Sequence, residues 1–127
     1  MIFDSRQAFA YYKTSYLIPS FFMSQTEEKI AMYTEELAKY VDSVDAELLQ
    51  TIVSKLGPSI FSADAELVSS SDPTEMERVV KFIINNLAFD STFEKVEAAA
   101  ASAVETMGSS NPQKFRAVFC YLAVQAL

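Results

Sequence analysis

The 127-residue sequence contains no histidine, only two glycines and a single cysteine. Without histidine, the commonest general base and metal ligand are missing, as is every Ser-His or Cys-His arrangement for nucleophilic catalysis. Two isolated glycines, Gly57 and Gly108, cannot form a glycine-rich phosphate loop and are too few for a fold built on hairpins. Because Cys120 stands alone, it cannot form an intrachain disulfide or a CxxC metal site, so we expect a cytoplasmic or another reducing compartment.

The sequence also lacks a long uncharged apolar run. A membrane-spanning helix needs about 18 or more such residues, so we expect no transmembrane segment. The formal charge is −7, from 17 acidic and 10 basic residues, and this charge opposes binding to the phosphate backbone of nucleic acids. The composition is otherwise ordinary for a globular chain, with 50% hydrophobic residues. We therefore expect an acidic, soluble protein that binds no nucleic acid.

Helix-start signals recur after residue 23. Ser24 followed by Glu27 has the pattern of a capping box and predicts a helix over about 25–41. Asp45 predicts the start of a second helix, which ends at the Gly-Pro pair 57–58. The apolar residues of this second helix recur at the spacing of one buried face. They are Leu49, Ile52, Val53 and Leu56.

Three further helices follow. The Asp-Pro pair 72–73 predicts the third, because aspartate is a good cap and proline is favoured at the first helical position. Ser91 with Glu94 predicts a second capping box, and Gly108 predicts the end of that fourth helix. The Asn-Pro pair 111–112 predicts the start of the last helix. The expected buried faces are Phe93, Val96, Ala100, Val104 and Met107 in the fourth helix and Phe115, Val118, Phe119 and Leu122 in the last.

The predicted fold class is all-α. Residues 24–127 form a single domain, a compact bundle of about five helices joined by short loops. The longest linker is 58–71, where the pattern is too brief to decide whether a helical turn forms around 64–68. Residues 1–23 form an aromatic N-terminal extension with a helical segment of its own.

The aromatic extension differs chemically from the rest of the chain. Residues 1–26 carry a net charge of +1, whereas 27–127 contain 8 basic and 16 acidic residues, a net of −8. A helix with aromatic residues on several sides cannot be covered by the bundle alone, and exposed aromatic patches mark contacts with other molecules. The predicted partner-binding residues are Phe9, Tyr11, Tyr12, Tyr16, Phe21 and Phe22.

Two other interpretations of residues 1–23 stay open. The segment folds over the bundle as part of its core, or it is a targeting segment, since it is basic and poor in acidic residues.

A second and weaker candidate site surrounds the start of the last predicted helix. Lys114 and Arg116 are cations in its first turn, where they oppose the helix dipole. Together with Ser109, Ser110 and free backbone amides they form a candidate anion-binding site. The alternative, which we favour, is a salt bridge to one of the many carboxylates. The serine run 69–71 is interpreted first as a cap and turn, and second as a phosphate-binding or phosphorylated loop.

No cofactor or metal is expected. Asp64, Glu66 and Asp72 lie close together in the sequence but lack the central glycine and final glutamate of an EF-hand loop, so capping and solvation explain them. Cys120 lies in an apolar helix without a histidine or a dense basic cluster beside it. We interpret it as a buried and unreactive thiol.

Two stretches have the look of a known family. Residues 66–73, which end in Ser-Ser-Ser-Asp-Pro, and the helix 114–122 resemble the small bacterial family catalogued as domain of unknown function 2853. Residues 33–40 and 53–56 fit its first helices. The resemblance covers about 30–127 and implies a compact all-α fold but no activity. Ser70 stands where the family is expected to have cysteine, and Cys120 where it is expected to have an aromatic, so no thiol chemistry follows.

By elimination, we expect a non-enzymatic protein-interaction module. It is either a homo-oligomer or an accessory subunit of a larger assembly, and it docks through residues 1–23. One alternative is binding to a membrane surface or to a small anionic or hydrophobic ligand, with peripheral membrane contact through the same aromatic residues. The other is an enzyme that works with carboxylates, tyrosines and Lys114.

Overall fold

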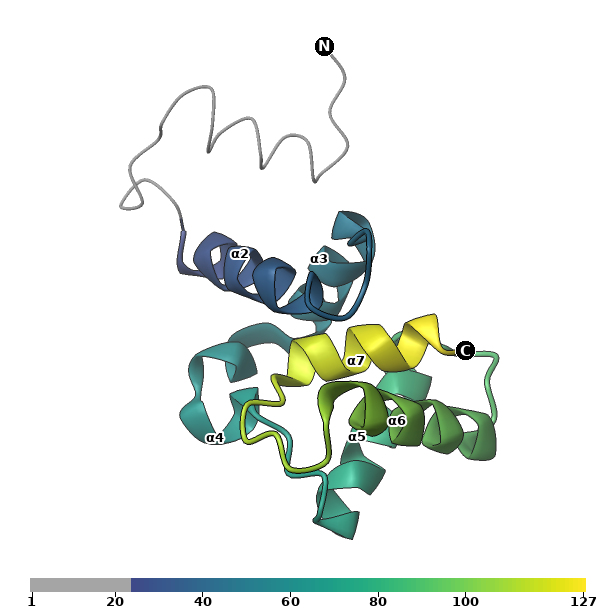
Figure 1. Ribbon diagram of the computed structural model, residues 1–127. Coiled ribbons are helices and arrows are strands. Elements are labelled where there is room, and N and C mark those ends of the chain that lie inside the picture. The colour runs from purple at the N-terminus through teal and green to yellow at the C-terminus, as the bar shows by residue number, and fades with distance from the viewer. Residues whose placement is uncertain (1–23) are drawn as a thin grey trace. The chain divides into compact units, whose positions relative to one another are not determined.

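The computed structural model describes residues 24–127, and Figure 1 shows their helices. The predicted partner-binding residues in the segment 1–23 lie outside the described residues; they are Phe9, Tyr11, Tyr12, Tyr16, Phe21 and Phe22. The described part is all-α, as predicted. It contains no strand, and its one isolated bridge pairs Leu67 with Phe115.

All five helices expected after residue 24 are present. In addition, a short 3-10 helix begins at Gly57, and a single turn of α-helix follows it within the linker 58–71. The elements are α2 (Gln25–Leu37), α3 (Ala46–Leu56), η2 (Gly57–Phe61), α4 (Ala63–Glu66), α5 (Pro73–Asn86), α6 (Phe93–Met107) and α7 (Arg116–Gln125).

The chain divides into two compact units, with the boundary between Thr51 and Ile52 inside α3. In the first unit, the predicted capping box is present: Ser24 Oγ accepts a hydrogen bond from the Glu27 amide (3.1 Å), and Glu27 Oε1 accepts one from the Ser24 amide (3.0 Å). Helix α2 is shorter than the predicted 25–41, because the chain tightens into a turn after Leu37. Asp45 caps α3 by accepting a hydrogen bond from the Leu48 amide (3.1 Å).

In the second unit, α7 is the most extensively buried helix. Seven consecutive residues, Ala117–Ala123, are buried, and a helix that is buried all round must have neighbours on several sides. Helix α7 packs against α6, α5 and α4, and α5 also packs against α6 (Figure 1). The α6 residues Ala99, Ala100 and Ala103 are buried, and their small side chains allow the close approach of a neighbouring helix.

The start of α6 differs from the prediction. The cap is Thr92, whose hydroxyl accepts a hydrogen bond from the Lys95 amide (3.2 Å), and the predicted capping box of Ser91 with Glu94 is wrong. The Ser91 amide donates instead to the Ala88 carbonyl (3.1 Å), which holds Ser91 in the preceding turn. Phe93 is therefore the first helical residue and is 38% exposed rather than buried.

The start of α7 also differs, because the helix begins at Arg116 and not at the Asn-Pro pair 111–112. Asn111 Oδ1 accepts a hydrogen bond from the Gln113 amide (2.9 Å), which forms a turn in place of a helix start. The Lys114 carbonyl then accepts a hydrogen bond from the Val68 amide (2.8 Å), a bridge that keeps the chain extended before α7. Lys114 consequently precedes the helix, and only Arg116 stands in its first turn.

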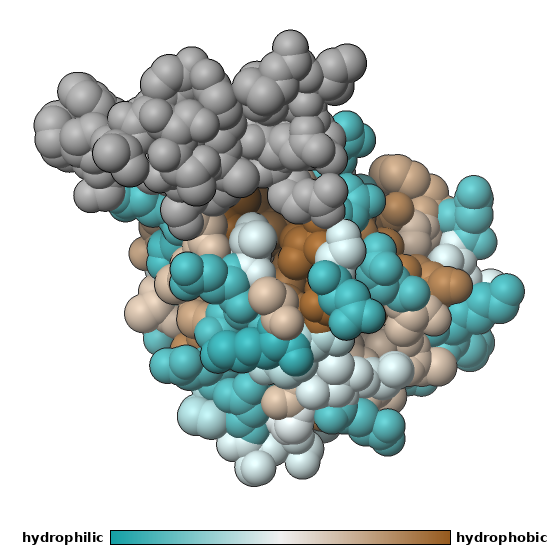
Figure 2. Space-filling model, turned by 45° about the horizontal axis from the view of Figure 1, so that its top comes forward, coloured by the Kyte–Doolittle hydropathy of each residue, from teal (hydrophilic) through white to brown (hydrophobic). Residues whose placement is uncertain are grey.

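No helix among residues 24–127 has the length and apolar character needed to cross a membrane. Figure 2 shows one face of the molecule, on which hydrophilic side chains are interspersed with hydrophobic ones. The large apolar side chains that are exposed in the described part are Phe61, Phe89, Phe93 and Leu127.

Candidate functional site

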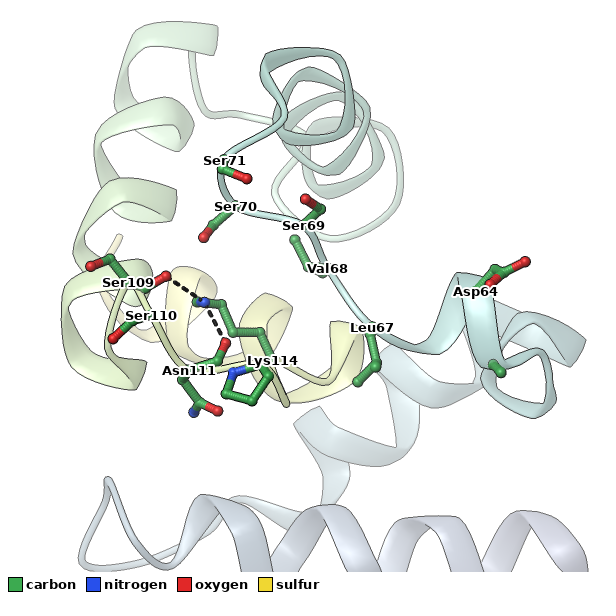
Figure 3. A pocket seen from close by; sticks show the side chains of 12 residues that line it. Asp64, Leu67, Val68, Ser69, Ser70, Ser71, Ser109, Ser110, Asn111 and Lys114 are labelled. Carbon is green, nitrogen blue, oxygen red and sulfur yellow. Dashed lines mark hydrogen bonds between the residues drawn. The ribbon is translucent and has the colours of Figure 1, made fainter.

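A pocket of about 420 Å³ lies in the second unit between two loops that contain serines (Figure 3). One loop precedes α5 and the other joins α6 to α7. The lining residues are Ala63, Asp64, Leu67, Val68, Ser69, Ser70, Ser71, Ser109, Ser110, Asn111, Pro112 and Lys114. The volume falls near the lower end of the range of small-molecule sites, about 300–1,000 Å³.

The two loops meet because Arg116 and the bridge at Val68 hold them. Arg116 Nε donates a hydrogen bond to the Ala65 carbonyl (2.7 Å), and an Arg116 Nη donates to the Leu67 carbonyl (3.4 Å). The same guanidinium forms an ion pair with Glu75 in the first turn of α5. Arg116 therefore forms the salt bridge that we favour above, and it does not line the pocket. Its role is to position the loops rather than to contact a ligand.

Lys114 forms the inner end of the pocket. It is the one charged residue of the described part that is buried, with 3% of its surface exposed. Its Nζ donates hydrogen bonds to the carbonyls of Asn111 (2.6 Å) and Ser109 (3.0 Å). An ammonium group has three N–H donors, so one remains for a ligand. Burial of a charge is costly unless it is paired, and a bound anion would complete the pairing.

The serines divide into an inner and an outer set. Ser70 is half-buried, and its hydroxyl points toward the Lys114 ammonium in Figure 3. Ser69 and Ser71 flank it and are exposed, and so are Ser109 and Ser110, which lie on the other side of the ammonium. The hydroxyls and backbone amides of these serines donate no hydrogen bond within residues 24–127. Successive free amides in loops of this kind provide anion-binding concavities.

The charge inside the pocket is positive. Asp64 is the other charged lining residue, and it is exposed and stands well apart from the ammonium in Figure 3. Asp72, next to the serine run, directs its carboxylate to the amides of Thr74 (2.9 Å) and Glu75 (3.4 Å) at the start of α5. The pocket therefore offers one cation and several neutral donors to a negatively charged group.

The same geometry argues against a Ser-Lys nucleophilic pair. Such a pair requires the lysine nitrogen to accept a proton from the serine hydroxyl. Lys114 Nζ instead donates to two carbonyl oxygens, which hold it in the donor role. Within the described part, no group of three or more His, Cys, Asp or Glu side chains is arranged to hold a metal ion.

Cys120 lies outside the pocket and is buried in α7, as predicted. Burial disfavours the thiolate and raises the pKa of Cys120 to about 12, while the nearby Arg116 charge acts in the opposite direction. The thiolate is the reactive form of cysteine, so this side chain is poorly suited to nucleophilic chemistry.

A second hollow of about 440 Å³ lies between α6 and the end of the chain. Its lining residues are Ser91, Lys95, Ala98, Ala99, Ser102, Ala126 and Leu127. Lys95 is exposed, and most of the other lining residues have small side chains. It therefore lacks the buried charge that distinguishes the Lys114 pocket.

The structure brings together three of the four residues predicted for an anion site. Ser109, Ser110 and Lys114 line one pocket, whereas Arg116 is committed to Glu75. The Ser109 carbonyl oxygen also accepts a hydrogen bond from Lys114, a contact that the sequence does not predict. Ser70 belongs to the serine run 69–71, and nothing in one sequence indicates that this run meets the loop after α6.

Comparison with known proteins identifies the family of the chain. A family model described as "Protein of unknown function (DUF2853)" matches residues 32–127. The matched region contains both serine loops and Lys114, and it agrees with the resemblance seen in the sequence over about 30–127. No curated protein and no solved structure matches the chain.

Proposed function

Since the chain belongs to the DUF2853 family of proteins of unknown function, whose description names no activity, we propose a function from the geometry: the domain binds a small anionic ligand in the Lys114 pocket. The observation that carries this proposal is the buried ammonium at the inner end of an open pocket, with 3% exposure and two carbonyl partners. A purely structural lysine would not need an adjacent cavity lined by unpaired donors.

The interaction is short-ranged. The chain as a whole carries −7, which repels anions at long range, so affinity depends on direct contacts with Lys114 and the loop donors. A hydrogen bond to a charged group contributes about 1.5–3 kcal/mol, and each 1.4 kcal/mol is about tenfold in affinity. Loss of the ammonium should therefore weaken anion binding by about tenfold to a hundredfold.

Isothermal titration of the full chain with inorganic phosphate tests the proposal. We expect the wild-type chain and Lys95→Met to bind phosphate alike, because Lys95 lies in the other hollow, and Lys114→Met to bind at least tenfold more weakly. Because Lys114→Met also leaves the Ser109 and Asn111 carbonyls without a donor, its fold is checked by circular dichroism. Ser70→Ala provides a second variant that keeps the lysine. If the wild-type chain binds neither phosphate, sulfate nor acetate, the proposal is wrong.

A second candidate function rests on the sequence alone. Seven of the sixteen Phe and Tyr residues lie in the first 23 positions, and we propose that they dock a protein partner, either a second copy or a larger assembly. Light scattering after size exclusion compares the wild-type chain with a variant in which Tyr11, Tyr12 and Tyr16 are serine. A mass that falls to that of the monomer supports self-association. Identical monomeric masses exclude self-association as the role of these tyrosines.

A further inference from the structure

The two sets of serines differ in depth, and this difference points to a class of ligand. We infer that the pocket takes the phosphate monoester of a small polyhydroxylated molecule, such as a sugar phosphate. This inference rests on the proposed function, which requires only that some small anion binds.

The inner end of the pocket suits a phosphate group. Lys114 is buried below it, and the half-buried Ser70 directs its hydroxyl to the same place from the opposite side (Figure 3). A phosphate monoester has three terminal oxygens in a tetrahedral arrangement, so it accepts hydrogen bonds from several directions. A carboxylate offers two oxygens in one plane and would leave part of this donor set unused.

The outer rim suits hydroxyl groups. Ser69, Ser71, Ser109 and Ser110 are exposed, and in Figure 3 the hydroxyls of Ser109 and Ser110 point away from the ammonium. A serine hydroxyl both donates and accepts hydrogen bonds, which matches the hydroxyls of a polyol. The exposed carboxylate of Asp64 adds an acceptor at the far edge.

The lining argues against two larger classes of phosphorylated ligand, nucleotides and phospholipids. No lining residue is aromatic, so the pocket offers no surface on which a nucleobase could stack, a contact worth about 1–3 kcal/mol per base. The apolar part of the wall is limited to Ala63, Leu67, Val68 and Pro112. A volume of about 420 Å³ fits a small metabolite.

The test is an isothermal titration that measures the affinity of the full chain for four ligands. They are glucose 6-phosphate, inorganic phosphate, acetate and adenosine monophosphate. We expect glucose 6-phosphate to bind about tenfold more tightly than inorganic phosphate, acetate to bind more weakly than either, and adenosine monophosphate to gain nothing over inorganic phosphate. Ser70→Ala should weaken the binding of glucose 6-phosphate and of inorganic phosphate. Ser110→Ala should weaken glucose 6-phosphate alone, and Ser102→Ala in the other hollow should change neither.

Each contrary result has a distinct meaning. Acetate that binds as tightly as glucose 6-phosphate overturns the inference but leaves anion binding intact, and tighter binding of adenosine monophosphate overturns it in favour of a nucleotide. Capture of the chain by vesicles containing phosphatidic acid, dependent on Lys114, would assign the monoester to a lipid and overturn the soluble ligand. If none of the anions binds, the inference and the proposed function both fail.

Discussion

Arg116 and Glu75 form an ion pair that joins the start of α7 to the first turn of α5. Both side chains are 17% exposed, and the guanidinium also donates to the carbonyls of Ala65 and Leu67. One side chain thus connects α4, α5 and α7, and it holds one wall of the pocket in place. The pair sets the geometry of the site without contacting a ligand.

Removal of Arg116 should destabilise the protein. In Arg116→Ala, Glu75 and two backbone carbonyls lose a largely buried donor, and we expect the free energy of unfolding to fall by about 2–3 kcal/mol. Urea titration measures this change. Arg78→Ala is the matched control, because Arg78 reaches the same carboxylate at 4.0 Å but is 73% exposed; we expect a change below about 0.5 kcal/mol. Equal effects of the two substitutions would contradict the assigned role.

The threonine cap of α6 gives a local test of the fold. Thr92 Oγ1 accepts a hydrogen bond from the Lys95 amide, so Thr92→Ala should cost about 1 kcal/mol of unfolding free energy. Ser91→Ala should cost only a few tenths, because the Ser91 side chain caps nothing in the described part. The stabilities of the two variants are compared by thermal unfolding. A larger loss for Ser91→Ala would show that the helix starts one residue earlier.

The two glycines should respond differently to substitution. Gly108 ends α6 with φ 93° and ψ 121°, a conformation that costs a side chain about 1–3 kcal/mol. Gly57 has φ 62°, in the left-handed region that asparagine tolerates. An added Cβ meets no closer atom than 3.8 Å at Gly108 and none within 4 Å at Gly57, so steric clash plays no part. We expect Gly108→Ala to lower the melting temperature more than Gly57→Asn, and the reverse order would contradict this account.

Burial of Cys120 predicts a pH-dependent contribution to stability. Its pKa is raised from 9.0 to about 12 in the folded state, so above pH 9 the unfolded chain loses the thiol proton first. The contribution is complete below the unfolded pKa and is lost, by up to about 1.4 kcal/mol per pH unit, as the pH rises toward the folded value. The difference in unfolding free energy between the wild type and Cys120→Ala should therefore shrink between pH 9 and 11. A difference that stays constant over this range would show that the thiol is not shielded from water.

Local signals in the sequence account for most of the helices. Ser24, Asp45 and Asp72 cap α2, α3 and α5 as predicted, because a cap depends on atoms within three residues. Gly108 ends α6 for a similarly local reason, its positive φ. At Ser91 and Thr92, two neighbouring residues are both competent caps, and the turn from Ala88 decides between them.

The late start of α7 and the formation of the pocket come from long-range contacts. Helix α7 starts later than the Asn-Pro pair indicates, because the Val68 amide bonds to the Lys114 carbonyl from a distant part of the chain. The same bridge, with Arg116, brings the serine run beside Lys114 and creates the pocket. A single sequence shows both serine loops, but it does not show that they meet.

The most direct test of the central claim locates the bound anion. The full chain, labelled with ¹⁵N, is titrated with inorganic phosphate while its amide resonances are followed. Binding in the Lys114 pocket predicts saturable shifts at the amides of residues 69–71, 109–111 and 113–114, and their loss in Lys114→Met. Shifts confined to the hollow beside Lys95, or none at saturating phosphate, would contradict the claim.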